Sequence, residues 1–184
     1  MLRTEPRPLT VHDYRELPEG PPYYQLIEGD LHMSPSPDLF HQDILMNVAV
    51  IIRNFLAKHP LGKVVAAPSD VRLTALNVYQ PDLYFVSNAR KSILSDHGAE
   101  DAPDLVVEIL SSKTAKLDKG VKREIYARTG VNELWLVDPA LRQIQVYHLS
   151  DSADVPYGTF SGRQEFTSRL LPGLKIKVEK VFDS

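Results

Sequence analysis

The chain contains no cysteine among its 184 residues. It therefore has no disulfide framework and no thiolate metal site, which leaves carboxylate and histidine side chains as the realistic metal ligands. A long uninterrupted apolar run is also missing, because the longest such stretch, ILMNVAVIIRNFL, contains Asn47 and Arg53. The N-terminus MLRTEPRPLTVHDY has no apolar signal core. We therefore expect a protein of the reducing cytoplasm that is neither exported nor membrane-spanning.

The sequence also lacks an overall excess of positive charge. The formal net charge is −3, so any contact with DNA must be local. One local surplus exists, because residues 113–128 hold six basic and two acidic side chains. The basic ones are Lys113, Lys116, Lys119, Lys122, Arg123 and Arg128. Such a run is typical either of a solvated helix face or of a nucleic-acid-binding surface.

Length and composition indicate a single domain. A chain of 184 residues, 43% of them hydrophobic and 24% charged, has an ordinary globular composition and buries a substantial core. Residues 1–22 are rich in proline and charge, and we expect them to form a packed N-terminal arm with a helical turn within residues 9–17.

Apolar spacing predicts one long helix. Ser36 and Pro37 are typical of a helix start, with serine as the N-cap and proline at the first helical position. Apolar residues then recur three or four apart from Ile44 to Leu56, and the segment His59-Pro60-Leu61-Gly62 ends the pattern. We expect this apolar stripe to pack on a sheet.

Strand patterns surround this helix. Residues 23–33, YYQLIEGDLHM, predict a hairpin because an EGD turn separates two apolar runs. Further strands are expected at residues 63–67, 70–73, 78–86, 105–110, 133–137 and 143–149, and a hairpin-like stretch at 157–166. A second helix is expected at 114–129, with Gly130 as its C-cap. This order predicts an α/β fold with a mixed sheet core and helices packed on its faces, in which residues 105–137 form a parallel crossover.

Glu108 is the most informative residue, because it interrupts the apolar strand DLVVEIL. Side chains alternate along a strand, so Glu108 shares one face with Val106 and Leu110. A carboxylate in that setting is costly unless a metal, a cation or strong donors meet it. The sequence therefore predicts a partner for Glu108.

Asp82 is the natural companion of Glu108. It follows Pro81, which cannot donate a ladder hydrogen bond and so marks a bulge, an edge or a strand start. Two carboxylates on neighbouring strands are typical ligands of a divalent cation in the hydrolysis of phosphate esters. The alternative is an aspartate that caps a turn.

The second helix adds a possible third member of the site. Asp118, Lys122 and Tyr126 fall four residues apart along one flank, and Lys122 lies beside residues expected to face the sheet. A lysine there would orient a water molecule or neutralise charge in the transition state. The alternatives are a surface ion pair between Lys122 and Asp118 and a core position for Tyr126.

Together these segments resemble a known family. The segments YQLIEG, SPSPDLFHQ, QPDLYFV, DLVVEILSSKTAKLDKGVKREIYARTGVNELWLVDP and LPGL are similar to the Uma-type restriction endonucleases of the PD-(D/E)xK nuclease superfamily. The resemblance implies a restriction-endonuclease-like core in which Asp82 and Glu108 bind Mg²⁺ or Mn²⁺ for the hydrolysis of DNA. It also implies that Lys122 replaces the lysine usually found two residues after the acid, where this chain has Leu110. A further departure is Gln25, since related sequences often carry glutamate there.

Further residues and alternatives complete the hypothesis. His41, at the start of the long helix, and Asp70 are candidate accessory residues, although a lone histidine and a turn aspartate are often structural. Lys113, Lys116, Lys119 and Arg123 are candidate DNA contacts. A nuclease-fold protein that binds nucleic acid or a partner without cutting is the alternative function, and a buried Glu108–Lys122 ion pair without chemistry is a third. Because cutting both strands often uses two active sites, we expect a homodimer.

Overall fold

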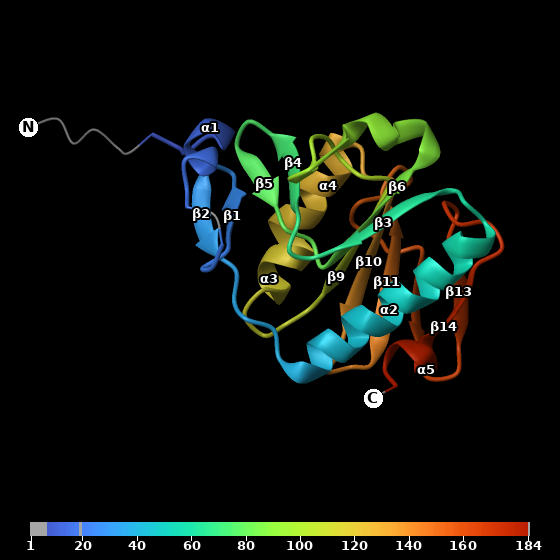
Figure 1. Cartoon of the computed structure of the whole chain (residues 1–184). Coiled ribbons are helices and arrows are strands. Elements are labelled where there is room, and N and C mark those ends of the chain that lie inside the picture. Colours follow the sequence, from blue (N-terminus) through green and yellow to red (C-terminus); the bar gives the residue numbers. More distant parts are fainter. Residues whose placement is uncertain (1–6, 19, 184) are drawn as a thin grey trace, which may run out of the picture.

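A six-stranded mixed sheet forms the centre of the computed structural model, which describes residues 7–18 and 20–183 (Figure 1). Its strands run in the order β12-β11-β10-β9-β6-β3. They are β3 (Gly62–Ala66), β6 (Leu83–Ser87), β9 (Leu105–Ile109), β10 (Glu133–Asp138), β11 (Gln143–His148) and β12 (Gly158–Ser161). The β9–β10 pair is parallel and the other neighbours are antiparallel. The predicted mixed sheet and its parallel crossover are confirmed.

A second sheet carries the N-terminal hairpin, in the order β2-β1-β5-β4-β8-β7. Its strands are β1 (Tyr24–Ile27), β2 (Asp30–Met33), β4 (Asp70–Thr74), β5 (Asn77–Tyr79), β7 (Leu94–Ser95) and β8 (Gly98–Ala99). Because β1 and β2 are adjacent in this sheet, the predicted hairpin at residues 23–33 is confirmed. A separate pair joins β13 (Glu165–Thr167) to β14 (Lys175–Lys177).

Helices pack on these sheets. They are α1 (Val11–Arg15), α2 (Leu39–Lys58), α3 (Ala115–Leu117), α4 (Arg123–Thr129) and α5 (Val178–Val181), with a 3₁₀ segment at Asn88–Ile93 and a π-helical segment, η2, at Asp118–Lys122. Gly130 ends α4 in the left-handed conformation at φ 98°, as predicted. None of the described helices has the length and apolar character needed to span a membrane.

Three sequence-based expectations differ from the structure. The long helix begins at Leu39 rather than Pro37, because the Asp38 carboxylate accepts a hydrogen bond from the His41 amide and acts as the N-cap. The strand expected at 78–86 is two strands, separated at Gln80 to Asp82 around Pro81, which lacks a donor. The hairpin expected at 157–166 is absent, because β12 pairs with β11 and β13 pairs with β14.

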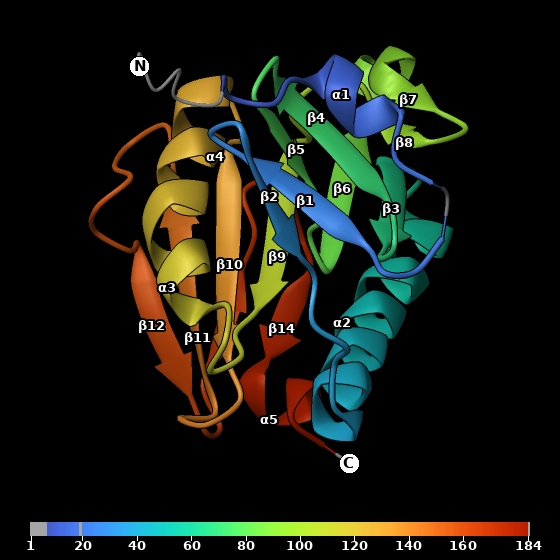
Figure 2. The same ribbon diagram turned by 90° about the vertical axis from the view of Figure 1, so that its left-hand side faces the viewer.

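The central sheet separates two hydrophobic clusters, as the alternation of β9 predicts. Leu105, Val107 and Ile109 face the buried side of α2. Val106 and Leu110 face the other cluster, which includes residues of α4 and of the second sheet. Figure 2 shows α2 and the α3–α4 segment on opposite sides of the central strands. Glu108, which lies on the same face of β9 as Val106 and Leu110, therefore faces α4 and not α2.

Asn77 joins the strands of the second sheet. Its side chain is fully buried and donates hydrogen bonds to Glu28 Oε1 and Thr74 Oγ1, both at 2.9 Å. Its Oδ1 accepts from the Glu28 amide at 3.0 Å and from the Tyr79 hydroxyl at 2.8 Å. We expect Asn77→Ala to lower the free energy of unfolding by about 2 kcal/mol or more, because it leaves buried polar groups without partners. Urea denaturation measures this change.

The matched control is Asn54→Ala, because Asn54 is an exposed asparagine on α2. We expect this change to alter the free energy of unfolding by no more than about 0.5 kcal/mol. Equal effects of the two substitutions would contradict the role given to Asn77.

Candidate active site

Glu108 lies in the middle of β9 and is 3% exposed. Its Oε1 accepts a hydrogen bond from the Tyr126 hydroxyl at 2.6 Å and lies 2.6 Å from the Lys122 Nζ. Both partners come from the helical segment that crosses this face of the sheet. The sequence predicts that Glu108 has a partner, and the structure gives it two, Lys122 and Tyr126.

Lys122 joins Glu108 to a second buried carboxylate. Its Nζ lies 2.9 Å from Asp118 Oδ1, and the side chains of Lys122 and Asp118 are 4% and 3% exposed. The ion pair between these residues, one of the alternatives, is therefore present, but it is buried and does not lie on the surface. The ammonium also lies 5.6 Å from the centre of the Tyr79 ring, within the range of a cation–π interaction. Tyr79 precedes Asp82 by three residues in VYQPD, and nothing in the strand pattern singles it out.

A kink divides the helical segment that carries these groups. The helix expected at 114–129 consists of α3, the segment η2 and α4. Within η2, Gly120 has non-helical dihedral angles, φ −108° and ψ −112°, so the helix is interrupted between Asp118 and Lys122. Asp118 and Lys122, at the two ends of η2, are both buried, whereas Val121 is half-buried.

The electrostatics of this cluster follow from burial. The pKa of Glu108 is raised to about 8, because burial and the charges of Asp118 and Asp82 raise it by more than the nearby Lys122 lowers it. Burial also acts to lower the pKa of Lys122, but the charges of Glu108 and Asp118 outweigh it and the pKa is raised. Burial raises the pKa of Tyr126 as well. Lys122 therefore remains an ammonium ion that two carboxylates share.

Asp82 lies directly before β6, at the end of the central sheet. Because Leu83 pairs with Val107, one further step of this antiparallel register brings Asp82 opposite Glu108. Its Oδ2 accepts a hydrogen bond from the Ile109 amide at 2.7 Å. This bond ties the aspartate to the strand that carries Glu108.

His41 reaches Asp82 from α2. Its Nε2 lies 3.3 Å from Asp82 Oδ1. Burial acts to lower the pKa of His41, but the hydrogen bond and charge of Asp82 outweigh it, so the pKa is raised. The position of His41 at the start of the long helix thus coincides with a direct contact to a candidate ligand. Asp82 is held from two sides, by β9 and by α2.

Gln25 and Asp70 have other contacts. Gln25 Oε1 accepts from the Gln80 amide at 3.1 Å, and its Nε2 donates to Ser34 Oγ at 3.2 Å. Asp70 Oδ1 accepts from Gln80 Nε2 at 2.8 Å and from the Tyr14 hydroxyl at 3.1 Å. Asp70 lines a cavity of about 700 Å³ beneath α1, whose described lining includes neither Asp82 nor Glu108. Both residues thus support the segment before Asp82 rather than contact Glu108.

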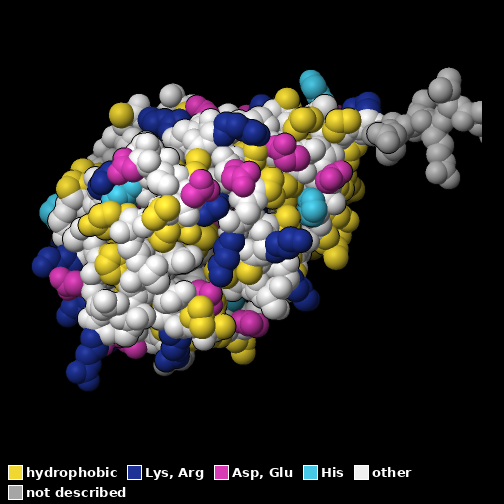
Figure 3. Space-filling view, turned by 180° about the vertical axis from the view of Figure 1, so that it is seen from behind, with side chains coloured by type: hydrophobic (Ala, Val, Ile, Leu, Met, Phe, Trp, Pro, Cys, Tyr) yellow, Lys and Arg dark blue, Asp and Glu magenta, His cyan; other side chains and the backbone are white. Residues whose placement is uncertain are grey.

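The candidate DNA-contacting residues differ in their surroundings. Lys113 and Lys116 are exposed. Lys119 pairs with Asp138 at 3.5 Å. Arg123 pairs with Asp154 at 3.4 Å and lies over the Tyr147 ring at 5.4 Å. Seen from behind (Figure 3), basic and acidic side chains are interspersed, and the described side chains on that face form no continuous basic patch.

Comparison with known proteins gives the family and the fold of the chain. Residues 11–179 match the model of the family Uma2, described as "Putative restriction endonuclease". Among solved structures, the chain is similar to a "putative nuclease belonging to DUF820" from Anabaena variabilis, with a TM-score of 0.80 and 19% sequence identity. The match covers 95% of this chain and 98% of that one, and it establishes the likeness of the fold. A search of curated proteins gives no match.

The buried cluster leads to a prediction about stability. We expect Lys122→Met to lower the free energy of unfolding by about 3 to 5 kcal/mol, because Glu108 and Asp118 then remain buried without their cation. Urea denaturation at neutral pH measures the loss. Lys116→Met is the matched control, since Lys116 is exposed on the preceding helical turn.

The stability loss caused by Lys122→Met should depend on pH, and the raised pKa of Glu108 gives the direction. A carboxyl whose pKa is raised in the folded state, to about 8 for Glu108, contributes stability below its unfolded pKa and loses that contribution as the pH rises. The loss of unfolding free energy caused by Lys122→Met should therefore become smaller as the pH falls toward 5. At neutral pH, the double variant Lys122→Met/Glu108→Gln should lose less stability than Lys122→Met alone. A deficit independent of both changes would contradict the electrostatic origin.

Proposed function

Because the chain belongs to the Uma2 family of restriction-endonuclease-like proteins, we propose that it is a metal-dependent endonuclease that hydrolyses DNA phosphodiester bonds. Asp82 and Glu108 are the proposed metal ligands, and Lys122 is the proposed catalytic lysine. Mg²⁺ is the expected cation, and Mn²⁺ the expected substitute.

The charge balance around Glu108 is the observation that carries the proposal. Asp82, Glu108 and Asp118 bring three carboxylates, whereas Lys122 brings one ammonium, and both Glu108 and Asp118 are buried. With all three carboxyls ionised and His41 neutral, the cluster would have a formal charge of −2, and the raised pKa of Glu108 reflects this excess of negative charge. Such a charge is unfavourable in a low-dielectric interior without a counter-charge. A divalent cation supplies that charge.

The donor set also fits Mg²⁺. Magnesium prefers oxygen ligands, retains several waters and is commonly held by one or two carboxylates. Among the described residues, no group of three or more His, Cys, Asp or Glu side chains is arranged to hold a metal ion. The protein would therefore contribute the two carboxylates of Asp82 and Glu108, and water would complete the shell. When bound, the cation supplies Lewis-acid polarisation of a phosphate and lowers the pKa of a coordinated water.

The neighbouring side chains prepare these carboxylates for that role. Tyr126 and Lys122 both contact Glu108 Oε1, which fixes the rotation of the carboxylate. The Ile109 amide and His41 fix the two oxygens of Asp82 in the same way. In the proposed reaction, the Lys122 ammonium, held next to Glu108, neutralises negative charge that develops on the phosphate.

A protein that binds nucleic acid without cutting it is the second candidate. Leu110 stands where the superfamily pattern has lysine, and the Lys122 ammonium is shared by two carboxylates instead of being free. Gln25 brings no charge, and its oxygen is used by the Gln80 amide. These observations favour weak or absent catalysis on the same fold.

Plasmid cleavage separates the two candidates. We expect the wild type to convert supercoiled DNA to nicked or linear forms in Mg²⁺ or Mn²⁺ and not in EDTA. Asp82→Asn and Glu108→Gln should each lower the rate by about two orders of magnitude or more, because each removes a charged metal ligand. Asp96→Asn is the matched control, since Asp96 is an exposed aspartate on a loop.

If no plasmid cleavage is observed, calorimetric titration with Mg²⁺ shows whether the protein binds the metal. Metal binding that both site substitutions abolish, without cleavage, would favour a site that is dormant on the DNA tested. DNA binding without metal binding would favour the second candidate. Cleavage that persists in both site variants would overturn the assignment of Asp82 and Glu108.

The DNA-contacting surface is a further part of the proposal. Lys113 and Lys116 are exposed beside the start of the helical segment that holds Lys122, so they are the strongest candidates for phosphate contacts. Lys119 and Arg123 each already face an aspartate. We therefore propose that these four residues contribute unequally.

Salt dependence of DNA binding tests this inequality. Each phosphate contact that is lost lowers the slope of log K against log salt concentration by about 1. We expect this decrease for Lys113→Ala and for Lys116→Ala in Ca²⁺, which permits binding without cutting. Arg123→Ala should alter the slope less and the thermal stability more. Lys175→Ala, at an exposed lysine on β14, is the control, and equal slopes in all variants would exclude this surface.

A further inference from the structure

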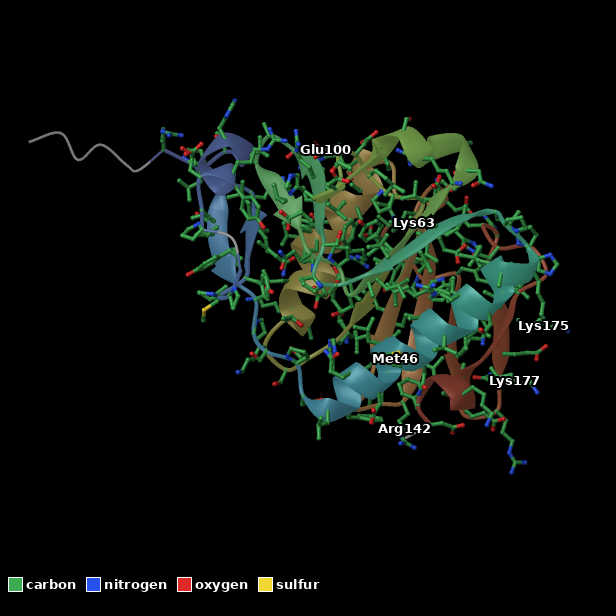
Figure 4. All side chains as sticks on the ribbon, in the orientation of Figure 1. Met46, Lys63, Glu100, Arg142, Lys175 and Lys177 are labelled. Carbon is green, nitrogen blue, oxygen red and sulfur yellow. The ribbon has the colours of Figure 1, made fainter. Side chains whose placement is uncertain are left out.

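Helix α2 exposes apolar side chains on the side that faces away from the sheet. Its inner side consists of Ile44, Leu45, Val48 and Ile52. On its outer side, Leu39 is 85% exposed, Met46 64% and Val50 46%. Figures 1 and 4 show α2 at the front of the molecule, with the labelled Met46 on it and no described segment across it. A helix that only covers a sheet normally has polar residues on this side.

The outer residues follow a heptad spacing. Starting from Leu39, steps of four and three residues alternate through the helix and lead only to exposed positions. The positions are Leu39, Asp43, Met46, Val50, Arg53 and Ala57. This spacing keeps a seam on one side of a helix over its full length and is typical of helices that pack against another helix. Four of the six seam residues are apolar.

The two charged seam residues select the orientation of a partner helix. In a parallel pair of identical helices, Asp43 would meet a second Asp43 and Arg53 a second Arg53, which is unfavourable. In an antiparallel pair with its two-fold axis at the level of Val48, Asp43 meets Arg53 of the partner subunit. The same arrangement brings Met46 next to Val50 of the partner subunit.

We propose that two copies of this chain associate through α2 in this antiparallel arrangement. Two-fold symmetry makes every contact occur twice. Two Met46–Val50 contacts therefore form the centre, and one Asp43–Arg53 ion pair lies on each side of it. Asn47, on one flank, donates hydrogen bonds to the carbonyls of Val181 and Asp183, so the C-terminal segment adds to the surface. The dimer is independent of the proposed nuclease activity, since no seam residue belongs to the Glu108 cluster.

The interface is small, because α2 has 20 residues and is therefore about 30 Å long. A single pair of helices buries less surface than a permanent dimer usually does. We therefore expect an equilibrium between monomer and dimer that depends on protein concentration. Sedimentation velocity over a series of concentrations measures it.

Charge reversal tests the surface and the orientation together. We expect Asp43→Arg and Arg53→Asp each to weaken the dimer by about tenfold or more, because each creates two repulsive contacts. A mixture of the two single variants should form a heterodimer at wild-type affinity, since it has two attractive ion pairs, one in the wild-type sense and one reversed. Both residues are exposed on a helix, and thermal melting of each variant verifies that its fold is unchanged.

Cysteine cross-linking tests the register of the two α2 helices. Because the chain has no cysteine of its own, any disulfide must form between the introduced cysteines. Met46→Cys mixed with Val50→Cys should form a disulfide-linked heterodimer in preference to either homodimer. A wild type that stays monomeric at its highest soluble concentration would overturn the proposal. A dimer that neither charge reversal weakens, or a mixture that shows no recovery, would also overturn it, because another surface or another orientation must then be used.

Discussion

The Lys122 ammonium, buried between Glu108 and Asp118, is the interaction on which the arrangement of this molecule depends. It is a buried point at which the central sheet and the α3–α4 segment meet through charge instead of apolar contact. Without it, Glu108 would leave a costly carboxylate in the middle of β9, and Asp118 would leave a second one in the helix. Tyr79 lies near the same ammonium and Tyr126 donates to Glu108, so residues from both sheets and from the helical segment converge on this ion pair.

Much of the fold could be predicted because the core patterns are local. The two faces of β9 follow from strict alternation, and α2 follows from apolar residues three and four apart. The errors occur where local signals compete. Ser36-Pro37 and Asp38 are all acceptable at a helix start, and the Asp38 carboxylate is the one that reaches the His41 amide. The ends of β12 and β13 depend on distant partners, which a hairpin-like spacing does not reveal.

The candidate site could be predicted in part, for a different reason. Glu108 and Asp82 are conspicuous because they are charged residues within or next to apolar strand segments. The four-residue spacing of Asp118, Lys122 and Tyr126 is also visible in the sequence. The burial of Asp118 was not predictable, because the spacing along a helix shows neither the kink at Gly120 nor what packs over this segment. Tyr79 was missed since an aromatic residue in a strand is ordinary. The assignment of these residues to metal binding and catalysis still depends on the family resemblance and remains a prediction.

The kink at Gly120 has a consequence for how the segment Asp118–Lys122 can vary. Gly120 departs from helical dihedral angles, and a Cβ added there would meet no described atom within 4 Å. A side chain added at this position therefore has no described neighbour to displace. Removal of one residue is different, because each residue of an α-helix turns the chain by about 100° and the side chains on one side of the gap would rotate away from those on the other. The segment tolerates a change of residue type far better than a change of residue number, so its length is under tighter constraint than its composition.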